Sequence, residues 1–246
     1  PPDGEGRSIA ELQALLRAHL ASSPFVKEHG LVLGYNYDDS QLAEQRHPTR
    51  HDLDAVTTEL PVVAWHQSGH LAVMNSLALE RSGIDAGTPD PEGGVIRREA
   101  GGQTPDGVLE ENAMIAALLP LLPKFTQAQT FELLESAQEI YASYGYTTVQ
   151  EGRVDPGTLV GLEAASAAGR LWLDFVAYPD FELNADSPAL HGPLMSRDYQ
   201  DHLRLGGLKL SLDGSPQGKT AHFTSPYVEP PPGQPEHQLG VTRRRP

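Results

Sequence analysis

The chain has 246 residues, of which 39% are hydrophobic and 21% are charged, values that are ordinary for a globular protein. Its 33 acidic and 18 basic residues give a formal net charge of −15. That charge repels phosphate backbones and anionic lipid surfaces, so we expect neither a nucleic-acid nor a membrane partner. Cysteine is absent, which excludes disulfides, thiolate zinc sites and cysteine nucleophiles. Because the sequence shows neither a signal peptide nor an apolar run of transmembrane length, we predict a cytoplasmic protein.

In the first half of the chain, apolar periodicity and capping residues predict helices and short strands. Residues 8–21 place their leucines on one helical face, and Ser8 with Glu11 forms a capping box. Thr49 is a suitable cap for a short helix. In chain order we predict a helix over 8–21, a strand over 31–34, a polar loop over 35–40, a helix over 49–54, a strand over 61–66, a helix over 71–81, loops or a hairpin over 88–106, and a helix over 107–122.

In the second half, helices and strands alternate, which favours βα units around a parallel sheet. We predict helices over 126–144, 155–168 and 199–203, and strands over 146–150, 171–178 and 208–212. The last 18 residues, 229–246, contain five prolines and show almost no apolar periodicity, so we expect a disordered or aberrant tail. The chain also begins with Pro1 rather than methionine, and we expect it to be a piece of a longer protein.

Polar residues follow the predicted strands of the second half, where parallel α/β folds carry their chemistry. Glu151 follows the strand over 146–150 and could bind a metal or act as a general base, but a solvated strand-end carboxylate explains it equally well. Asp213 follows the strand over 208–212. Within that strand, Lys209 shares a polar row with Ser211 and Asp213, and spacing alone favours an edge strand with one wet face.

The first half offers a second group of candidates. Residues 35–40 (YNYDDS) combine two phenols, an amide, two carboxylates and a hydroxyl, so Tyr35 and Asp38 could form a polar wall for a small ligand; an Asx-type turn is the alternative. His66 and His70 flank a tight turn. The turn makes a shared metal-binding helical face doubtful, and we favour substrate contact or a structural hydrogen bond, the latter for His66.

Several stretches together resemble one family. They are residues 34–38 (GYNYD), 48–54 (PTRHDLD), 68–76 (SGHLAVMNS), 90–94 (DPEGG), 107–111 (GVLEE), 145–149 (GYTTV) and 209–215 (KLSLDGS). In this order and spacing they are similar to the amidohydrolase superfamily, in the subgroup that includes N-substituted formamide deformylases. The resemblance covers roughly residues 3–228.

The resemblance implies a metal-dependent hydrolase with a (β/α)₈ barrel. It implies that the strands over 146–150, 171–178 and 208–212 are barrel strands two to four and that Lys209 is the bridging metal ligand. A carbamate on Lys209 would convert a cation into an oxygen ligand for a divalent metal, for which we expect zinc. The implied fold class is therefore α/β, a partial TIM barrel with a long insertion between strands one and two.

The resemblance also implies what is missing. The chain has no His-x-His pair, and it stops before the family's fifth strand, so Lys209 alone of the family's metal ligands is present. We therefore expect residues 1–144 to be an insertion and helical region after an absent first strand, and residues 145–228 to hold strands two to four.

Two function classes remain open at this point. The first is a metal-dependent hydrolase of carbon–nitrogen bonds in non-peptide amides or formamides, present as a fragment that is inactive alone or completed by another chain. The second is a non-catalytic α/β small-molecule binding protein that has lost the metal site. For either class we expect His70, Tyr35, Asp38, Glu151 and Asp213 to contact a small amide-type molecule, and we leave a homo-oligomer open.

Overall fold

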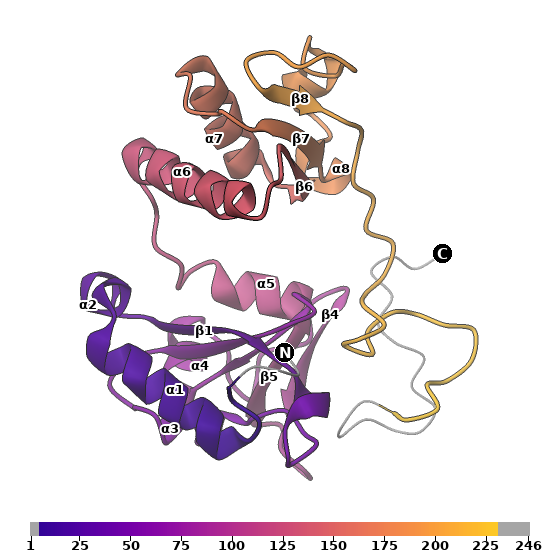
Figure 1. Ribbon diagram of the computed structural model, residues 1–246. Helices are drawn as coiled ribbons and strands as arrows, with labels where there is room; N and C mark the ends of the chain where they lie inside the picture. Colours follow the sequence, from indigo (N-terminus) through magenta and orange to yellow (C-terminus); the bar gives the residue numbers. More distant parts are fainter. Residues whose placement is uncertain (1–4, 231–246) are drawn as a thin grey trace. The chain divides into compact units, whose positions relative to one another are not determined.

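The computed structural model describes residues 5–230 and has a mixed α/β fold (Figure 1). The chain forms two compact units: one contains the residues up to Pro123 and the segment from Leu212 onward, and the other is Lys124–Ser211. The sequence predicts a division after residue 144, whereas the structure divides the chain before the helix over 126–144. From residue 231 onward, the predicted tail over 229–246 lies outside the described residues.

The first unit is built on a five-stranded sheet with the strand order β1-β2-β3-β5-β4. Strands β1 and β2 are parallel, and the other neighbouring pairs are antiparallel. The strands are β1 (Val32–Tyr37), β2 (Val62–His66), β3 (Leu71–Met74), β4 (Gly94–Arg98) and β5 (Pro105–Glu111). The helices are α1 (Ile9–Ser22), α2 (Pro24–His29), the 3₁₀ turn η1 (Asp39–Gln41), α3 (Arg50–Asp54), α4 (Ser76–Arg81) and α5 (Asn112–Leu118).

Both faces of this sheet are covered. Side chains alternate between the faces along a strand, so Val62 of β2 joins the core under α1 and α3, while Val63 joins the core under α4 and α5. Figure 1 shows α1 and α4 on opposite sides of the strands. Burial on both faces explains why β3, and β2 up to Trp65, are continuous apolar runs rather than alternating ones.

Two helices predicted in this unit are wrong in their first halves, where the structure has strands. The apolar run that predicts a helix over 71–81 is β3 followed by α4, with Asn75 between them capping α4 through Ala78 N. The run over 107–122 is the end of β5 followed by α5. A short apolar run that is buried on both faces has no period that separates a strand from a helix.

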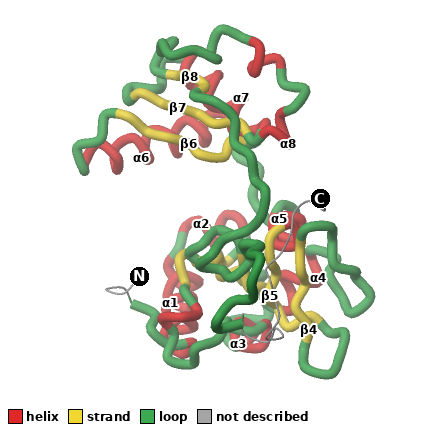
Figure 2. The backbone as a smooth tube through the Cα atoms, turned by 90° about the vertical axis from the view of Figure 1, so that its right-hand side faces the viewer, coloured by secondary structure: helices red, strands yellow, loops and turns green. Residues whose placement is uncertain are grey.

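The second unit is a three-stranded parallel sheet with the order β6-β7-β8 (Figure 2). Its elements are α6 (Gln127–Ser143), β6 (Thr148–Val154), α7 (Pro156–Ala167), β7 (Asp174–Pro179), α8 (Phe181–Asn184), the 3₁₀ turn η2 (Pro188–His191) and β8 (Leu203–Leu205). Phe131 and Leu134 of α6 pack against its core. The alternation predicted from the sequence is therefore confirmed as a parallel sheet. Among the described residues, this unit and the first contain no helix long and apolar enough to cross a membrane.

The third strand of this sheet lies earlier in the chain than predicted. The residues of the helix predicted over 199–203 lead into β8, with Asp201 and His202 at positive φ. The strand predicted over 208–212 is reduced to one bridge, in which Lys209 N donates to Pro179 O at 2.8 Å and Phe181 N donates to Lys209 O at 3.0 Å. Gly206 and Gly207 interrupt the apolar pattern between the two segments, and this break makes the earlier segment the strand.

Candidate functional site

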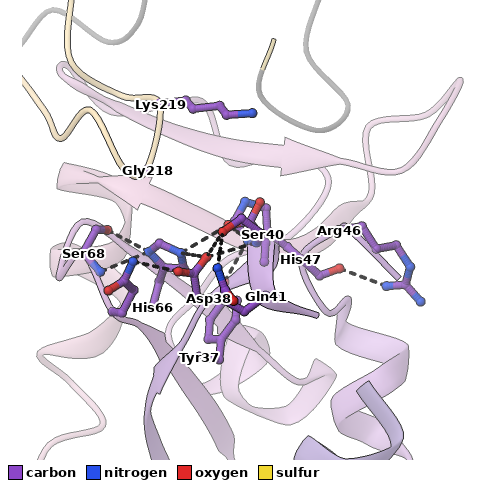
Figure 3. A network of polar contacts seen from close by, with 12 residues as sticks. Tyr37, Asp38, Ser40, Gln41, Arg46, His47, His66, Ser68, Gly218 and Lys219 are labelled. Carbon is purple, nitrogen blue, oxygen red and sulfur yellow. Dashed lines mark hydrogen bonds and ion pairs between the residues drawn. The ribbon is translucent and has the colours of Figure 1, made fainter. Parts of the chain in front are cut away.

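A cluster of acidic and histidine side chains lies where β1 ends beside β2 (Figure 3). Parallel pairing places Tyr37 opposite His66, and Asp38 then caps η1 by accepting from Ser40 N at 3.0 Å. The Tyr37 hydroxyl contacts His47 Nδ1 at 3.0 Å, and His66 Nε2 lies 3.2 Å from Asp39 Oδ1. Tyr37, which the sequence places in a loop, is thus the last residue of β1, and its burial fixes this cluster in the sheet.

Burial sets the charge states in this cluster. Desolvation, reinforced by the nearby Arg97 guanidinium, lowers the pKa of His47 to about 3, so this histidine is neutral at pH 7. Burial alone would raise the pKa of Asp39, but the contact with His66 and the neighbouring histidines outweigh burial, and the pKa of Asp39 is lowered. Burial also raises the pKa of Tyr37 well above its usual value. The cluster therefore carries its negative charge on carboxylates while His47 stays neutral.

Three ligand atoms of Asp38, Asp39 and His66 lie within 4.8 Å of one another, which is close enough to surround a cation. The hydrogen bonds of His66 argue against that use. The backbone N–H of Ser68 donates to His66 Nδ1 at 3.1 Å, so the neutral ring carries its proton on Nε2, the atom that faces Asp39. A metal bound to Nε2 would have to displace that proton. The group therefore fits a histidine–carboxylate contact better than a metal site, as the sequence suggests for His66.

The turn after β2 links this cluster to His70. Ser68 contacts His66 Nδ1 through its hydroxyl at 2.8 Å and accepts from His70 N at 3.2 Å. Gly69 has φ +76°, a left-handed conformation that favours glycine in this tight turn. His70 is thereby held at the start of β3, four residues from His66 but facing a different set of partners.

His70 is bound to a carboxylate that sequence reasoning missed. Its Nδ1 lies 2.8 Å from Oε1 and 3.0 Å from Oε2 of Glu111, the last residue of β5. Glu111 is fully buried, whereas 31% of the His70 side chain is exposed. Thr220 donates from its hydroxyl to Glu111 Oε1 at 2.6 Å. The acidic pair Glu110–Glu111 within an apolar run could have indicated a buried site residue. It was not used because residues 107–122 were predicted to be one helix.

The segment carrying Thr220 lies tightly against this carboxylate. A Cβ atom on Gly214 would come within 2.3 Å of Thr220 Oγ1 and 2.6 Å of Glu111 Oε1. A Cβ atom on Gly218 would come within 2.5 Å of Leu71 Cδ1. At Gly214 the Thr220 backbone also lies within 2.6 Å of the added Cβ atom, so glycine is required there for the approach of residues 213–220 to Glu111, whereas at Gly218 the close atom is the end of a flexible side chain.

The other predicted residues of the first unit have partners of their own. Tyr35 and Asp38 line a cavity of about 270 Å³ between α1 and β1, together with Leu12 and Arg7. Tyr35 also stacks on Trp65, with ring centroids 5.9 Å apart. Asp213 is half-buried and accepts from His222 N at 3.1 Å.

The second unit contains Glu151 and Lys209. Glu151 is exposed, and it lies inside β6 rather than at the strand's end, because β6 continues to Val154. Its Oε1 accepts from Arg153 N at 3.2 Å. Lys209 is half-buried beside the carboxyl end of β7, where its backbone pairs with the strand. Among the described residues, no hydrogen bond or ion pair engages its ammonium group.

Comparison with known proteins gives one consistent family. A profile of the amidohydrolase family matches residues 1–245. The chain is 35% identical over 143 residues to the N-substituted formamide deformylase of Arthrobacter pascens, covering 57% of this chain and 26% of that protein. It is 26% identical over 235 residues to YtcJ of Bacillus subtilis (strain 168), named as an amidohydrolase, covering 91% of this chain and 42% of the relative.

Solved structures agree with this match. A metal-dependent hydrolase from Pyrococcus furiosus superposes with a TM-score of 0.56 and 25% identity, over 96% of this chain and 44% of that chain. A second one, from Pyrococcus horikoshii OT3, has a TM-score of 0.60 at 23% identity, over 97% of this chain and 43% of that chain, and supports the fold. The chain thus spans less than half the length of the relatives and structures that it matches.

Proposed function

Because this chain belongs to the amidohydrolase family, we propose that the protein is a metal-dependent hydrolase of carbon–nitrogen bonds in small, non-peptide amides or formamides. The family match and the metal-dependent hydrolases among the solved structures support a hydrolase that uses a divalent metal. The similarity to a formamide deformylase supports the amide-type substrate. The activity is proposed for the whole protein, since the chain spans less than half of its relatives.

The observation that carries this proposal is the position of Lys209. Exposure alternates along its segment: Leu208 is 41% and Leu210 62% exposed, while Lys209 between them is half-buried. Lys209 also lies at the carboxyl end of a parallel sheet, the end at which α/β folds place their chemistry. The ammonium group of this half-buried lysine has no partner among the described residues, so it is available for modification or for a ligand.

A divalent metal, for which we propose zinc, fits this lysine. A carbamate on Nζ would present anionic oxygens, which are suitable ligands for zinc. When bound, the metal supplies a Lewis acid for the amide carbonyl and makes water ionise more readily. Substrate contacts are proposed for His70, Tyr35, Asp38, Glu151 and Asp213.

We also propose that the second unit is one segment of a (β/α)₈ barrel and that the first unit is an insertion ahead of it. The order β6, α7, β7 and then β8, with all three strands parallel and adjacent, is the repeat from which such barrels are built. The strands would be barrel strands two to four, with β8 in the place that the sequence gives to 208–212.

Metal content tests the role of Lys209. We expect the whole protein, purified with Zn²⁺, to retain the metal after dialysis and its Lys209→Ala variant to lose it, as measured by plasma mass spectrometry. Lys124→Ala, an exposed lysine ahead of α6, is the matched control and should retain the metal. Stoichiometric zinc in Lys209→Ala would remove Lys209 from the ligand set. A metal-free wild-type protein that still binds formamides would instead be a small-molecule binding protein.

A further inference from the structure

Glu111 has a backbone conformation that few non-glycine residues adopt. It lies between β5 and α5 with φ 52° and ψ −123°, a combination that is costly for a residue with a Cβ atom. Strain of this kind persists only where surrounding contacts hold it, and it concentrates at functional sites. Here the Glu111 N–H donates to His70 O at 2.8 Å, and the carboxylate contacts both His70 and Thr220.

The directions of the hydrogen bonds that join Glu111 to Thr220 and to His70 can be assigned. Thr220 Oγ1 accepts from Ser215 N at 2.9 Å, so its own proton points to Glu111 Oε1. An ionised carboxylate only accepts hydrogen bonds, and so His70 Nδ1 must be the donor to Glu111. In the neutral ring this tautomer leaves Nε2 as a hydrogen-bond acceptor.

The two side chains of the His70–Glu111 pair differ in their exposure to solvent. Glu111 is covered on one side by Gly214 and Thr220, and its side chain is 0% exposed. His70 is 31% exposed, so part of its ring reaches solvent while Nδ1 is held inside. A buried carboxylate that orients a partly exposed imidazole is the arrangement by which proteins fix a histidine tautomer.

We propose that Glu111 is a positioning residue that holds His70 in the Nδ1–H tautomer, and that His70 Nε2 accepts a hydrogen bond from the amide N–H of the substrate. This inference rests on the proposed function and adds a substrate class to it. N-monosubstituted amides carry the N–H and bind at His70; N,N-disubstituted amides lack it and do not. Thr220 and the glycines of residues 213–220 complete the cover of the carboxylate.

Nitrogen NMR of the wild-type protein tests the tautomer directly. With ¹⁵N-labelled histidine, we expect the His70 ring at neutral pH to show a protonated Nδ1 and an unprotonated Nε2. In Glu111→Gln the fixed preference should be lost, because the glutamine amide group can donate to Nδ1. Glu99→Gln, which changes a carboxylate that contacts His51, should leave the His70 signals unchanged. Protonation of Nε2 in the wild type would overturn the proposal without use of any variant.

Ligand titration tests the substrate class. We expect N-propylformamide to shift the His70 Nε2 resonance and N-methyl-N-propylformamide, which lacks the N–H, to leave it in place. Glu111→Gln should weaken binding of the first amide about tenfold, the equivalent of one hydrogen bond, and should not affect the second. Equal responses to both amides, or a response to neither, would overturn the proposal.

These readouts separate the two proposals because neither requires turnover. If N-propylformamide shifts Nε2 but is not hydrolysed by the metal-loaded whole protein, the hydrolase function fails and the role of Glu111 and His70 stands. If the amide is hydrolysed while Nε2 is protonated or unresponsive, the hydrolase function stands and the role of Glu111 and His70 fails.

Discussion

The two units of the molecule use sheets of similar residue types in opposite ways. In the first unit both faces of the five-stranded sheet are packed against helices, and Val62, Val63 and Leu109 are at most 1% exposed. In the second unit, four consecutive residues of β6, from Gln150 to Arg153, are exposed although the sheet is parallel. Parallel sheets are normally covered on both faces. The first unit is therefore packed by its own residues, whereas the second unit exposes a sheet surface that such folds usually bury.

The units also differ in the partners of the charged side chains on which the two proposals rest. In the first unit two adjacent buried carboxylates are paired: Glu110 contacts Arg97, and Glu111 contacts His70 and Thr220. The second unit holds Lys209 half-buried with no partner among the described residues. Paired groups mainly stabilise and orient side chains, while an unpaired lysine is free to be modified or to bind. For this reason we propose positioning in the first unit and metal binding in the second.

The largest expected difference is in the response to leucine truncation. Leu109→Ala in β5 removes a fully buried side chain and should lower the free energy of unfolding by about 3 kcal/mol. Leu210→Ala removes a 62% exposed side chain and should change it by less than about 0.5 kcal/mol. Urea denaturation followed by circular dichroism measures both. Equal losses would mean that Leu210 is buried in solution, and the contrast between the units would disappear.

In the second unit one buried polar side chain holds the segment that leads into β7. Gln138 of α6 is fully buried and accepts from Trp172 N at 2.8 Å and Leu173 N at 3.1 Å. Gln138→Ala leaves these groups without that partner and should cost about 2 kcal/mol. The exposed Gln150→Ala is the control and should be nearly neutral. An unchanged unfolding midpoint in Gln138→Ala would show that water replaces the glutamine.

The stability of the first unit should depend on pH through His47. The pKa of His47 is about 3 in the folded state and close to 6.5 when unfolded, so below pH 6.5 the unfolded chain binds one more proton. Stability is therefore full above pH 6.5 and should fall by about 1.4 kcal/mol per pH unit between pH 6 and 5. His47→Gln should flatten this dependence, whereas the exposed His51→Gln should keep it. A slope that survives in His47→Gln would assign it to another group.

The smallest effect concerns the start of α6. The Thr126 hydroxyl accepts a hydrogen bond from Gln129 N, and Gln129 Oε1 accepts one from Thr126 N. Thr126→Ala should therefore cost about 1 kcal/mol. Thr130 donates to the carbonyl one turn back, which adds little, so Thr130→Ala should stay within about 0.5 kcal/mol. Similar thermal shifts for both variants would contradict the capping interpretation.

The sequence correctly predicted the helices whose ends are marked by capping residues or glycines. Ser8 and Thr49 cap the helices that they predict, and Gly145 and Gly169 follow the ends of α6 and α7. The predictions were wrong where burial on both faces of a strand removed the alternation of apolar and polar residues, as in β3 and β5. The third parallel strand is Leu203–Leu205, ahead of Gly206 and Gly207. The apolar alternation around Lys209 favoured the wrong segment, 208–212.

The candidate site shows the same limit. His70 and Lys209 could be chosen from their sequence contexts, and the structure gives each a distinct place. Glu111 and Thr220 are 109 residues apart and meet only through the fold, so no local pattern joins them. Asp39 and His47 were missed because their role depends on burial beside Tyr37 and His66, which a loop predicted over 35–40 did not provide.

Hydrolysis under metal control tests the central claim most directly. Release of propylamine and formate from N-propylformamide is measured for the whole protein, for which the activity is proposed, as purified, after removal of metal with a chelator, and after addition of Zn²⁺. The proposed function predicts hydrolysis that stops on chelation and returns with Zn²⁺, and that is lost in Lys209→Ala. Hydrolysis that continues in the chelated protein, or a zinc-loaded protein that leaves the amide intact, would contradict it.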